Sequence, residues 1–233
     1  MNIALFGYGK MGKMLEKLAV DRSHKIVAKI DEDTAAIDFS NVDVAIDFST
    51  PDAAFQNITS CFEKNIPVIS GTTGWLAKYD EALALCAQKK GAFIYASNFS
   101  LGVNIFFELN IQLAKMMAHI EQYHVTMEET HHTQKLDAPS GTAITLAEDI
   151  IENSGYANWT MKEPQTNEIA ITAKREGNVP GTHGINYKSA VDTIEIKHTA
   201  HNREGFALGA LIAAEWILGK TGVFSMKDVL NLK

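Results

Sequence analysis

The first hundred residues alternate short apolar runs with longer segments in which apolar residues recur at helical spacing. Residues 11–20 are an example, because Met11, Leu15 and Leu18 lie three or four positions apart and share one helix face. We predict strands at residues 2–6, 25–30, 42–48, 67–70 and 93–96, and helices at 11–20, 51–65 and 75–90. Strands and helices that alternate in this way form right-handed βαβ units, so we predict an α/β fold with a Rossmann-type parallel sheet.

One connection in this series is unusually short. Only residues 31–41 join the predicted strands at 25–30 and 42–48. A crossover that contains a full helix needs about a dozen residues or more. We therefore expect at most one turn of helix in this connection.

The pattern changes after Phe99, where segments typical of strands begin to cluster. We predict helices at 103–117, 141–153 and 204–220, a turn at 136–140, and β-rich segments at 123–129, 168–174, 184–188 and 192–198. Strands grouped in this way, after a βαβ half, are typical of a separate α+β unit. We therefore expect a second, α+β domain.

Composition and charge exclude several classes of protein. Of the 233 residues, 46% are hydrophobic and 21% are charged, which is typical of a folded globular chain. The net charge of −7 disfavours partners such as nucleic acid or an anionic membrane surface. Cys61 and Cys86 form no CxxC pair, so a disulfide framework or a zinc site is not indicated. No apolar segment approaches the roughly 20 residues of a membrane span, and we expect a cytoplasmic protein.

The first candidate for chemistry is a glycine-rich turn at residues 7–12, GYGKMG, which matches G-x-G-x-x-G between a predicted strand and a predicted helix. In a dinucleotide site, Gly7 makes the tight turn, Gly9 lets the backbone approach the pyrophosphate, and Gly12 allows close helix–strand packing. The phosphates lie at the helix N-terminus, and Lys10 is a further partner for them. The predicted cofactor contacts in this turn are Gly7, Tyr8, Gly9, Lys10, Met11 and Gly12.

Asp31 ends the second predicted strand, 19 residues after Gly12. An acidic residue at this place binds the adenosine ribose hydroxyls and repels a 2′-phosphate. No Arg follows it, since the next residues are Glu32 and Asp33, and we expect Lys29 to point along the strand. We predict that NADH is the preferred cofactor and that NADPH remains possible.

Two further turns follow predicted parallel strands, at residues 71–74 and 97–100. Open α/β sheets bind ligands at the carboxyl ends of their strands. The small residues of these turns permit close approach of a nicotinamide ring and its ribose.

The second candidate for chemistry is the stretch of residues 128–143, which holds two histidines, a lysine and a Ser-Gly-Thr helix start. Adjacent histidines on an extended segment point to opposite faces, so we predict no metal site. Acid–base chemistry by His131 and Lys135 is the favoured interpretation. Ser140, Gly141 and Thr142 start a helix and are suited to bind a carboxylate.

Together these segments resemble one family. The run that begins at Glu128, E-x-x-H-H-x-x-K-x-D-A-P-S-G-T-A, resembles the signature of the 4-hydroxy-tetrahydrodipicolinate reductase (dihydrodipicolinate reductase) family of lysine and diaminopimelate biosynthesis. The resemblance runs through nearly the whole chain, because it also includes residues 7–12, 44–49, 71–74, 98–104 and 206–210.

The resemblance implies a dinucleotide-binding domain of residues 1–100 plus 208–233, and a substrate-binding and oligomerisation domain of residues 101–207 in a homotetramer. It implies the reduction of 4-hydroxy-tetrahydrodipicolinate, a cyclic dicarboxylate, to tetrahydrodipicolinate with NAD(P)H. The chain departs from many members in its shorter segment between the Ser-Gly-Thr helix and residues 175–183, within the part assigned to oligomerisation.

The resemblance also implies roles for single residues. His131 is similar to the family's catalytic acid/base and Lys135 to its proton donor. The positions that match substrate contacts are His132, Gly141 and Thr142, beside Ser140. The positions that match cofactor contacts are Gly71, Thr72, Thr73, Ala96, Ser97, Asn98 and Phe99.

The implied reaction passes a hydride from the nicotinamide to the far end of a conjugated imine, and His131 or Lys135 then supplies a proton. Two other classes of protein share part of the pattern. Another two-domain nicotinamide dehydrogenase of an anionic small molecule would share residues 7–12 but not residues 128–143. A non-catalytic cofactor sensor would need neither His131 nor Lys135.

Overall fold

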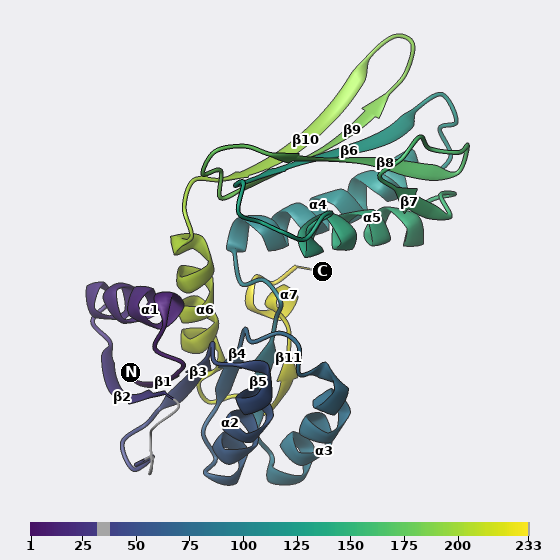
Figure 1. Cartoon of the computed structure of the whole chain (residues 1–233). Helices are drawn as coiled ribbons and strands as arrows, with labels where there is room; N and C mark the ends of the chain where they lie inside the picture. Colours follow the sequence, from purple (N-terminus) through teal and green to yellow (C-terminus); the bar gives the residue numbers. More distant parts are fainter. Residues whose placement is uncertain (32–37, 233) are drawn as a thin grey trace. The chain divides into compact units, whose positions relative to one another are not determined.

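The structure is a computed structural model that describes residues 1–31 and 38–232 (Figure 1). It divides into two compact units. Unit 1 contains Met1–Leu101 and Glu204–Lys233, and unit 2 contains Gly102–Arg203. The chain returns to unit 1 at Glu204, before the expected residue 208, because the helix that carries it back begins there. The expected short connection at residues 31–41 lies largely outside the described residues.

Unit 1 contains a six-stranded sheet in the order β11-β5-β4-β3-β1-β2, in which all neighbouring strands are parallel. The strands are β1 (Asn2–Phe6), β2 (Lys25–Ile30), β3 (Val44–Asp47), β4 (Val68–Ser70), β5 (Ala92–Tyr95) and β11 (Gly222–Phe224). The strand order reverses at β1, which lies between β2 and β3, so a ligand crevice is expected at their carboxyl ends. This sheet confirms the predicted Rossmann-type α/β fold.

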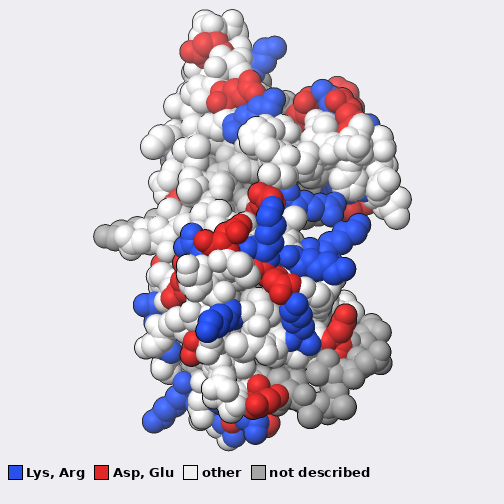
Figure 2. Space-filling view, turned by 90° about the vertical axis from the view of Figure 1, so that its left-hand side faces the viewer, with Lys and Arg blue, Asp and Glu red and all other residues white. Residues whose placement is uncertain are grey.

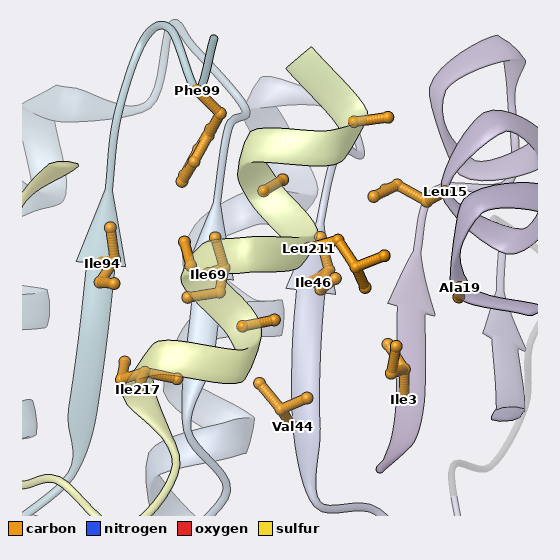
Figure 3. Close-up of a cluster of buried hydrophobic side chains, with 14 of the residues drawn as sticks. Ile3, Leu15, Ala19, Val44, Ile46, Ile69, Ile94, Phe99, Leu211 and Ile217 are labelled. Atoms are coloured by element: carbon orange, nitrogen blue, oxygen red, sulfur yellow. The ribbon is translucent and has the colours of Figure 1, made fainter. Parts of the chain in front are cut away.

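Helices cover both faces of this sheet, and its central strands are therefore mostly apolar, with Asp47 and Ser70 at the ends of β3 and β4 (Figure 1). The helices of unit 1 are α1 (Lys10–Asp21), α2 (Pro51–Glu63), α3 (Tyr79–Lys89), α6 (Glu204–Ile217) and α7 (Met226–Val229), with a 3₁₀ turn at Leu76–Lys78. Leu15 and Ala19 of α1 and Leu211 of α6 pack on one face of the sheet (Figure 3). Helices α2 and α3 pack on the other face, where Ile58 and Phe62 are buried.

Unit 2 contains a mixed sheet in the order β10-β9-β6-β8-β7. Its strands are β6 (His124–His131), β7 (Asn158–Thr160), β8 (Glu168–Arg175), β9 (Gly181–Lys188) and β10 (Thr193–Ala200). Strand β6 is parallel to β8 and antiparallel to β9. Helices α4 (Leu101–Met117) and α5 (Gly141–Glu152) pack on one face of this sheet, as Figure 1 shows. This unit has the predicted α+β character.

The structure extends some predicted elements. Strand β6 continues through His131, two residues beyond the expected end at 129, because β8 and β9 pair with it on both sides. The short strands β7 and β11 were not predicted, since three residues carry too little periodicity to distinguish a strand from a loop. Within the described ranges, no helix is both long and apolar enough to cross a membrane.

Acidic side chains interrupt the basic ones on the face of the molecule that Figure 2 shows. A nucleic-acid partner needs a continuous basic surface that follows the phosphates. This face therefore gives no support for such a partner.

Candidate active site

The glycine-rich turn leads from β1 into α1 and has little room for side chains. Gly7 has φ of +84°, and a Cβ atom there would lie 2.2 Å from the carbonyl oxygen of Phe48. A Cβ atom on Gly12 would lie 2.4 Å from the carbonyl oxygen of Gly7. Glycine is therefore required at both positions to keep the helix close to the strands.

The N-terminus of α1 fits a phosphate group. A Cβ atom on Gly9 would have no atom within 4 Å, so its Cβ side faces open space. No described side chain caps this helix, and its first turn contains no acidic residue. The N–H groups at the helix start and the helix dipole are thus available to an anion, while Lys10 is exposed beside them.

Lys29 does not simply point along β2. Its ammonium group lies 2.7 Å from a carboxylate oxygen of Glu16 on α1 and donates a hydrogen bond of 3.0 Å to the hydroxyl of Tyr8. Tyr8 in turn donates to the other oxygen of Glu16. This ion pair lowers the pKa of Glu16 and raises that of Lys29. The nearest basic residue to Asp31 along the chain is therefore already paired with Glu16. Asp31 itself is an exposed residue directly after β2.

The turn at residues 71–74 is fixed by the buried carboxylate of Asp47 at the end of β3. Thr72 donates to this carboxylate at 2.7 Å, and its hydroxyl also accepts the backbone N–H of Ser49 at 2.9 Å. The remaining donors to Asp47 are the Oγ of Ser49 at 2.6 Å, Nδ2 of Asn57 at 3.1 Å and the Oγ of Ser70 at 2.8 Å. The hydroxyl of Thr72 is therefore a structural group, and Thr73 is the exposed threonine of the turn.

The turn after β5 differs in part from the expectation. Ser97 is exposed, and Asn98 accepts the backbone N–H of Ser100. Phe99, a predicted cofactor contact, is only 1% exposed and packs edge-on against Phe48 in the core (Figure 3). Its ring cannot face a cofactor, so any contact from this position is made by its backbone. These turns follow parallel strands and lie along one edge of the sheet.

In unit 2, a cluster of polar side chains is buried between β6, β8 and β9. Glu129 and His131 point to the same face of β6 because they are two residues apart. Glu129 is fully buried and pairs in register with His183 of β9, which is 6% exposed. The centroids of the His131 and His183 rings are 5.0 Å apart. His131 itself is 7% exposed.

Arg175 and the Ser140 turn both bind the Glu129 carboxylate. Nη2 of Arg175 lies 3.0 Å from one carboxylate oxygen, and the backbone N–H of Ser140 donates to the other at 3.0 Å. Burial raises the pKa of Glu129, but the hydrogen bonds from Ser140 and Arg175 outweigh it, so the net pKa lies below its usual range. Glu129 is therefore a carboxylate at neutral pH.

Lys135 lies in the loop after β6, with a side chain that is 22% exposed. Its ammonium group donates to both oxygens of Asp137, at 2.8 and 2.7 Å, which lowers the pKa of that carboxyl. Arg175 fixes the same loop, because it also donates to the backbone carbonyl oxygens of Lys135 at 3.3 Å and Asp137 at 2.6 Å. The position of Lys135 thus depends on Arg175.

The N-terminus of α5 forms a second anion-binding geometry. Ser140 caps this helix, since its Oγ accepts the backbone N–H of Ala143 at 3.2 Å and exchanges a hydrogen bond of 3.1 Å with Nε2 of His183. Gly141 and Thr142 begin the helix, and a Cβ atom on Gly141 would meet no atom within 4 Å. The helix start is therefore open to a carboxylate.

A hollow of about 380 Å³ in unit 2 is lined by His132, His201 and Arg203, among others. Nη2 of Arg203 lies 3.5 Å from Nε2 of His132. These groups donate hydrogen bonds or carry positive charge, which suits an anionic ligand. The structure thus adds Arg203 to the predicted substrate residue His132.

The two buried histidines are neutral at neutral pH. Burial lowers the pKa of His131, as do the cations Lys135 and Arg175, although the carboxylate of Glu129 raises it. Burial and the neighbouring His131 lower the pKa of His183 to about 4. His131 is therefore a neutral ring, while the ammonium group of Lys135 in the following loop is paired with Asp137.

One group in the described residues has distances that a metal ion could bridge: Glu129, His131 and His183, whose potential ligand atoms lie within 4.8 Å of one another. However, the oxygens of Glu129 already accept hydrogen bonds from Arg175 and Ser140. The positive charge of Arg175 would also oppose a bound cation. We assign no metal ion to this cluster.

Sequence analysis missed several residues of these sites. It quoted Glu128 as the acidic residue of the motif, but Glu128 points to the opposite face and pairs with Lys174 at 2.7 Å. The period-two alternation of β6 is the signal that would have selected Glu129. The other residues that received no role are Asp47, Arg175, His183 and Arg203. The first three lie in the runs 44–49 and 175–183 of the family resemblance, but nothing in those runs marks the contacts that they make.

Comparison with known protein families gives a match over both units. Residues 1–99 match the family model described as dihydrodipicolinate reductase, N-terminus, and residues 102–230 match the one described as dihydrodipicolinate reductase, C-terminus. The two models match residues of both units, and neither of them describes another kind of dehydrogenase or a cofactor sensor.

Curated proteins with similar sequences indicate the same family. The chain is 59% identical to a 4-hydroxy-tetrahydrodipicolinate reductase of Christiangramia forsetii, over 99% of this chain and 98% of the relative. It is 36% identical to a protein of the same name from Alkaliphilus oremlandii, over 100% of this chain and 99% of the relative.

A solved structure of dihydrodipicolinate reductase from Paenisporosarcina sp. TG-14, with dipicolinate bound, has the same fold. The TM-score is 0.78 at 22% identity, over 100% of this chain and 99% of that one. A probable dehydrogenase from Thermotoga maritima is less similar, with a TM-score of 0.58 at 11% identity over 98% and 92% of the two chains. On the matches to both family models and to the relatives in sequence, the chain belongs to the dihydrodipicolinate reductase family.

Proposed function

We propose that the chain reduces 4-hydroxy-tetrahydrodipicolinate to tetrahydrodipicolinate with NAD(P)H, a step of lysine and diaminopimelate biosynthesis. The observation that carries this proposal is the cluster in unit 2, where Lys135 and His131 lie on the elements that also form the anion-binding start of α5. This combination supplies a proton carrier and a carboxylate site to one ligand. The family match in both units supports it.

The nicotinamide cofactor binds in unit 1 under this proposal. The open side of Gly9 and the N-terminus of α1 hold the pyrophosphate, and Lys10 adds a positive charge. The turns after β4 and β5 contribute Gly71, Thr73 and the backbone from Ala96 to Phe99. When bound, the reduced nicotinamide supplies a hydride.

The substrate carboxylates bind in unit 2. One carboxylate lies at the start of α5, against the N–H groups and hydroxyls of Ser140, Gly141 and Thr142. His132 and Arg203 are the partners for the other. The relative from Paenisporosarcina binds dipicolinate, a flat dicarboxylate, which is the ligand chemistry that two anion sites require.

The chain's own part in catalysis is to orient the substrate and to deliver a proton. The 4-hydroxyl group of the substrate leaves as water, which gives a conjugated imine. Hydride addition at the far end of that system leaves an enamine, and one proton added to the enamine completes the reduction. Lys135 is the donor of that proton in this proposal, and the Asp137 carboxylate keeps its ammonium group in place. The neutral ring of His131 forms a hydrogen bond to the substrate or passes the proton on.

We further propose that NADH is preferred over NADPH. Asp31 is exposed where the adenosine ribose is expected, and a carboxylate there repels a 2′-phosphate. The charge of Lys29, the nearest cation along β2, is matched by Glu16.

The variant Glu16→Gln tests this explanation, because it releases Lys29 from its ion pair. We expect the KM for NADPH to fall severalfold, because the released Lys29 can then contact the 2′-phosphate. The KM for NADH should change little. Glu63→Gln on α2 is the control, since it makes the same change in net charge at an exposed residue. If both variants alter the KM for NADPH equally, the ion pair has no part in the preference.

We also propose that the protein is a cytoplasmic homotetramer. The face of the unit 2 sheet opposite α4 and α5 is rich in threonine and charged residues, such as Thr126, Glu128 and Lys174, and no helix of unit 2 covers it (Figure 1). Such a face is suited to pairing between copies of one chain.

A coupled assay tests the proposed function. The synthase of the pathway supplies the substrate, and the loss of NADH absorbance measures its reduction. We expect NADH to be consumed only when synthase, its substrates and this protein are all present. Consumption of NADH with a simple keto acid, with or without ammonia, and none with the synthase product, would assign the chain to another dehydrogenase activity.

A further inference from the structure

The buried carboxylate of Glu129 faces a ring nitrogen of His131 that has no other partner. Nδ1 of His131 is buried and forms no hydrogen bond among the described residues. An oxygen of the Glu129 carboxylate lies 3.6 Å from this nitrogen. This distance is longer than a hydrogen bond, so the carboxylate acts on Nδ1 through its charge.

That charge distinguishes the two neutral forms of the ring. A lone pair on Nδ1 would face a carboxylate in a buried, weakly screened place, which is repulsive. A proton on Nδ1 would instead be attracted to the same carboxylate. Arg175 and Ser140 hold the Glu129 oxygens in place, and the carboxylate therefore cannot rotate away.

The other ring nitrogen of His131 faces a position without a side chain. Nε2 lies 3.1 Å from where a Cβ atom of Gly181 would be. Because Gly181 lacks that atom, space remains beside Nε2. His183 packs against the ring at an interplanar angle of 68° and limits its rotation.

We propose that Glu129 is a positioning residue for His131: it holds the proton on Nδ1, so that Nε2 presents its lone pair toward the space beside Gly181 as the nitrogen that meets the substrate. This inference rests on the proposed reductase function and adds the form in which His131 enters the reaction. Glu129 itself touches neither substrate nor cofactor.

¹⁵N NMR of the protein labelled with ¹⁵N-histidine determines directly which ring nitrogen of His131 carries the proton. The signals of His131 are assigned by their loss in His131→Asn. In the wild-type protein near neutral pH, we expect the protonated nitrogen of His131 to be Nδ1. A proton on Nε2 would overturn the proposal, whatever the activity of the protein.

The variant Glu129→Gln keeps the size of the side chain and removes its charge. We expect the Nδ1–H form to lose its dominance and kcat to fall at least roughly tenfold, as when an orienting carboxylate is replaced by an amide in other enzymes. The KM for NADH should not change. A spectrum with unchanged Nδ1–H preference would contradict the proposal.

The pH profile gives a second result that a purely structural role would not produce. The charged or titratable groups that face His131 are Glu129 of β6, Arg175 of β8, His183 of β9, and His132 and Lys135 of the following loop. Among these, Glu129 favours the protonated ring and the cations disfavour it. The acid limb of kcat/KM should therefore move to lower pH in Glu129→Gln, and an unmoved limb would contradict the proposal.

Gly181→Ala is the matched second variant, because it fills the space beside Nε2 and leaves the carboxylate in place. We expect a lower kcat with the Nδ1–H form retained. Wild-type kcat in this variant would show that Nε2 does not use that space and would overturn that part of the proposal. Failure of the coupled assay in the wild-type protein would instead reject the reductase function, and the NMR result would stand independently.

Discussion

Lys135→Ala should lower kcat by about 10²–10⁴-fold, the usual contribution of a positioned proton donor. Lys135 is the proton donor that we propose for the unit 2 cluster, and Asp137 holds its ammonium group, whereas burial and nearby cations keep His131 neutral. The KM for NADH should stay close to its wild-type value, because the predicted cofactor contacts are in unit 1. Steady-state kinetics in the coupled assay measure both quantities.

Lys162→Ala is the control for this prediction. Lys162 is an exposed lysine of the same unit, so its loss changes the net charge equally. We expect it to retain wild-type kcat. Wild-type turnover in Lys135→Ala would show that another group supplies the proton.

Asp47→Ala should lower the free energy of unfolding by about 3 kcal/mol, because buried donors are left without an acceptor. Asp47 is fully buried and accepts hydrogen bonds from Ser70 and Thr72 as well as from two further side chains. The turn at residues 71–74 should also loosen, which raises the KM for NADH. Urea unfolding followed by tryptophan fluorescence measures the first effect.

Two further variants serve as comparisons for Asp47→Ala. Asp47→Asn keeps the shape and one acceptor oxygen, and it should be affected less. Asp52→Ala removes an exposed carboxylate in the first turn of α2. Apart from the lost interaction of this carboxylate with the helix dipole, the free energy of unfolding should change by well under 1 kcal/mol. A midpoint of Asp47→Ala equal to that of the wild type would mean that the network does not stabilise unit 1.

The sheet of unit 1 could be predicted because its residues obey local rules. Strands such as β1 and β3 are short and apolar apart from Asn2 and Asp47 at their ends, and α1 begins at a glycine turn of recognisable spacing. The roles of Thr72 and Phe99 could not be predicted in the same way. Both belong to turns that resemble cofactor contacts, but their side chains are used by the Asp47 network and by the core.

In the cluster of unit 2, only the residues that are close in sequence could be predicted. His131, Lys135 and Ser140 are close in sequence, and a local motif identifies them. His183 and Arg175 reach the cluster through the pairing of β6 with β9 and β8. Registers between strands that are distant in sequence are not visible in a local pattern, so the partners of Glu129 emerge only from the folded sheet.

The proposed reduction is tested most directly by following labelled hydrogen from NADH into the product. The coupled reaction is run in ordinary water with NADH that carries deuterium at its transferable position, and the product is analysed by mass spectrometry and NMR. We expect one deuterium on the ring carbon that receives the hydride, and an unlabelled proton, supplied through Lys135, at the site that completes the reduction. A product without deuterium, or NADH consumed without any reduced dicarboxylate, would contradict it.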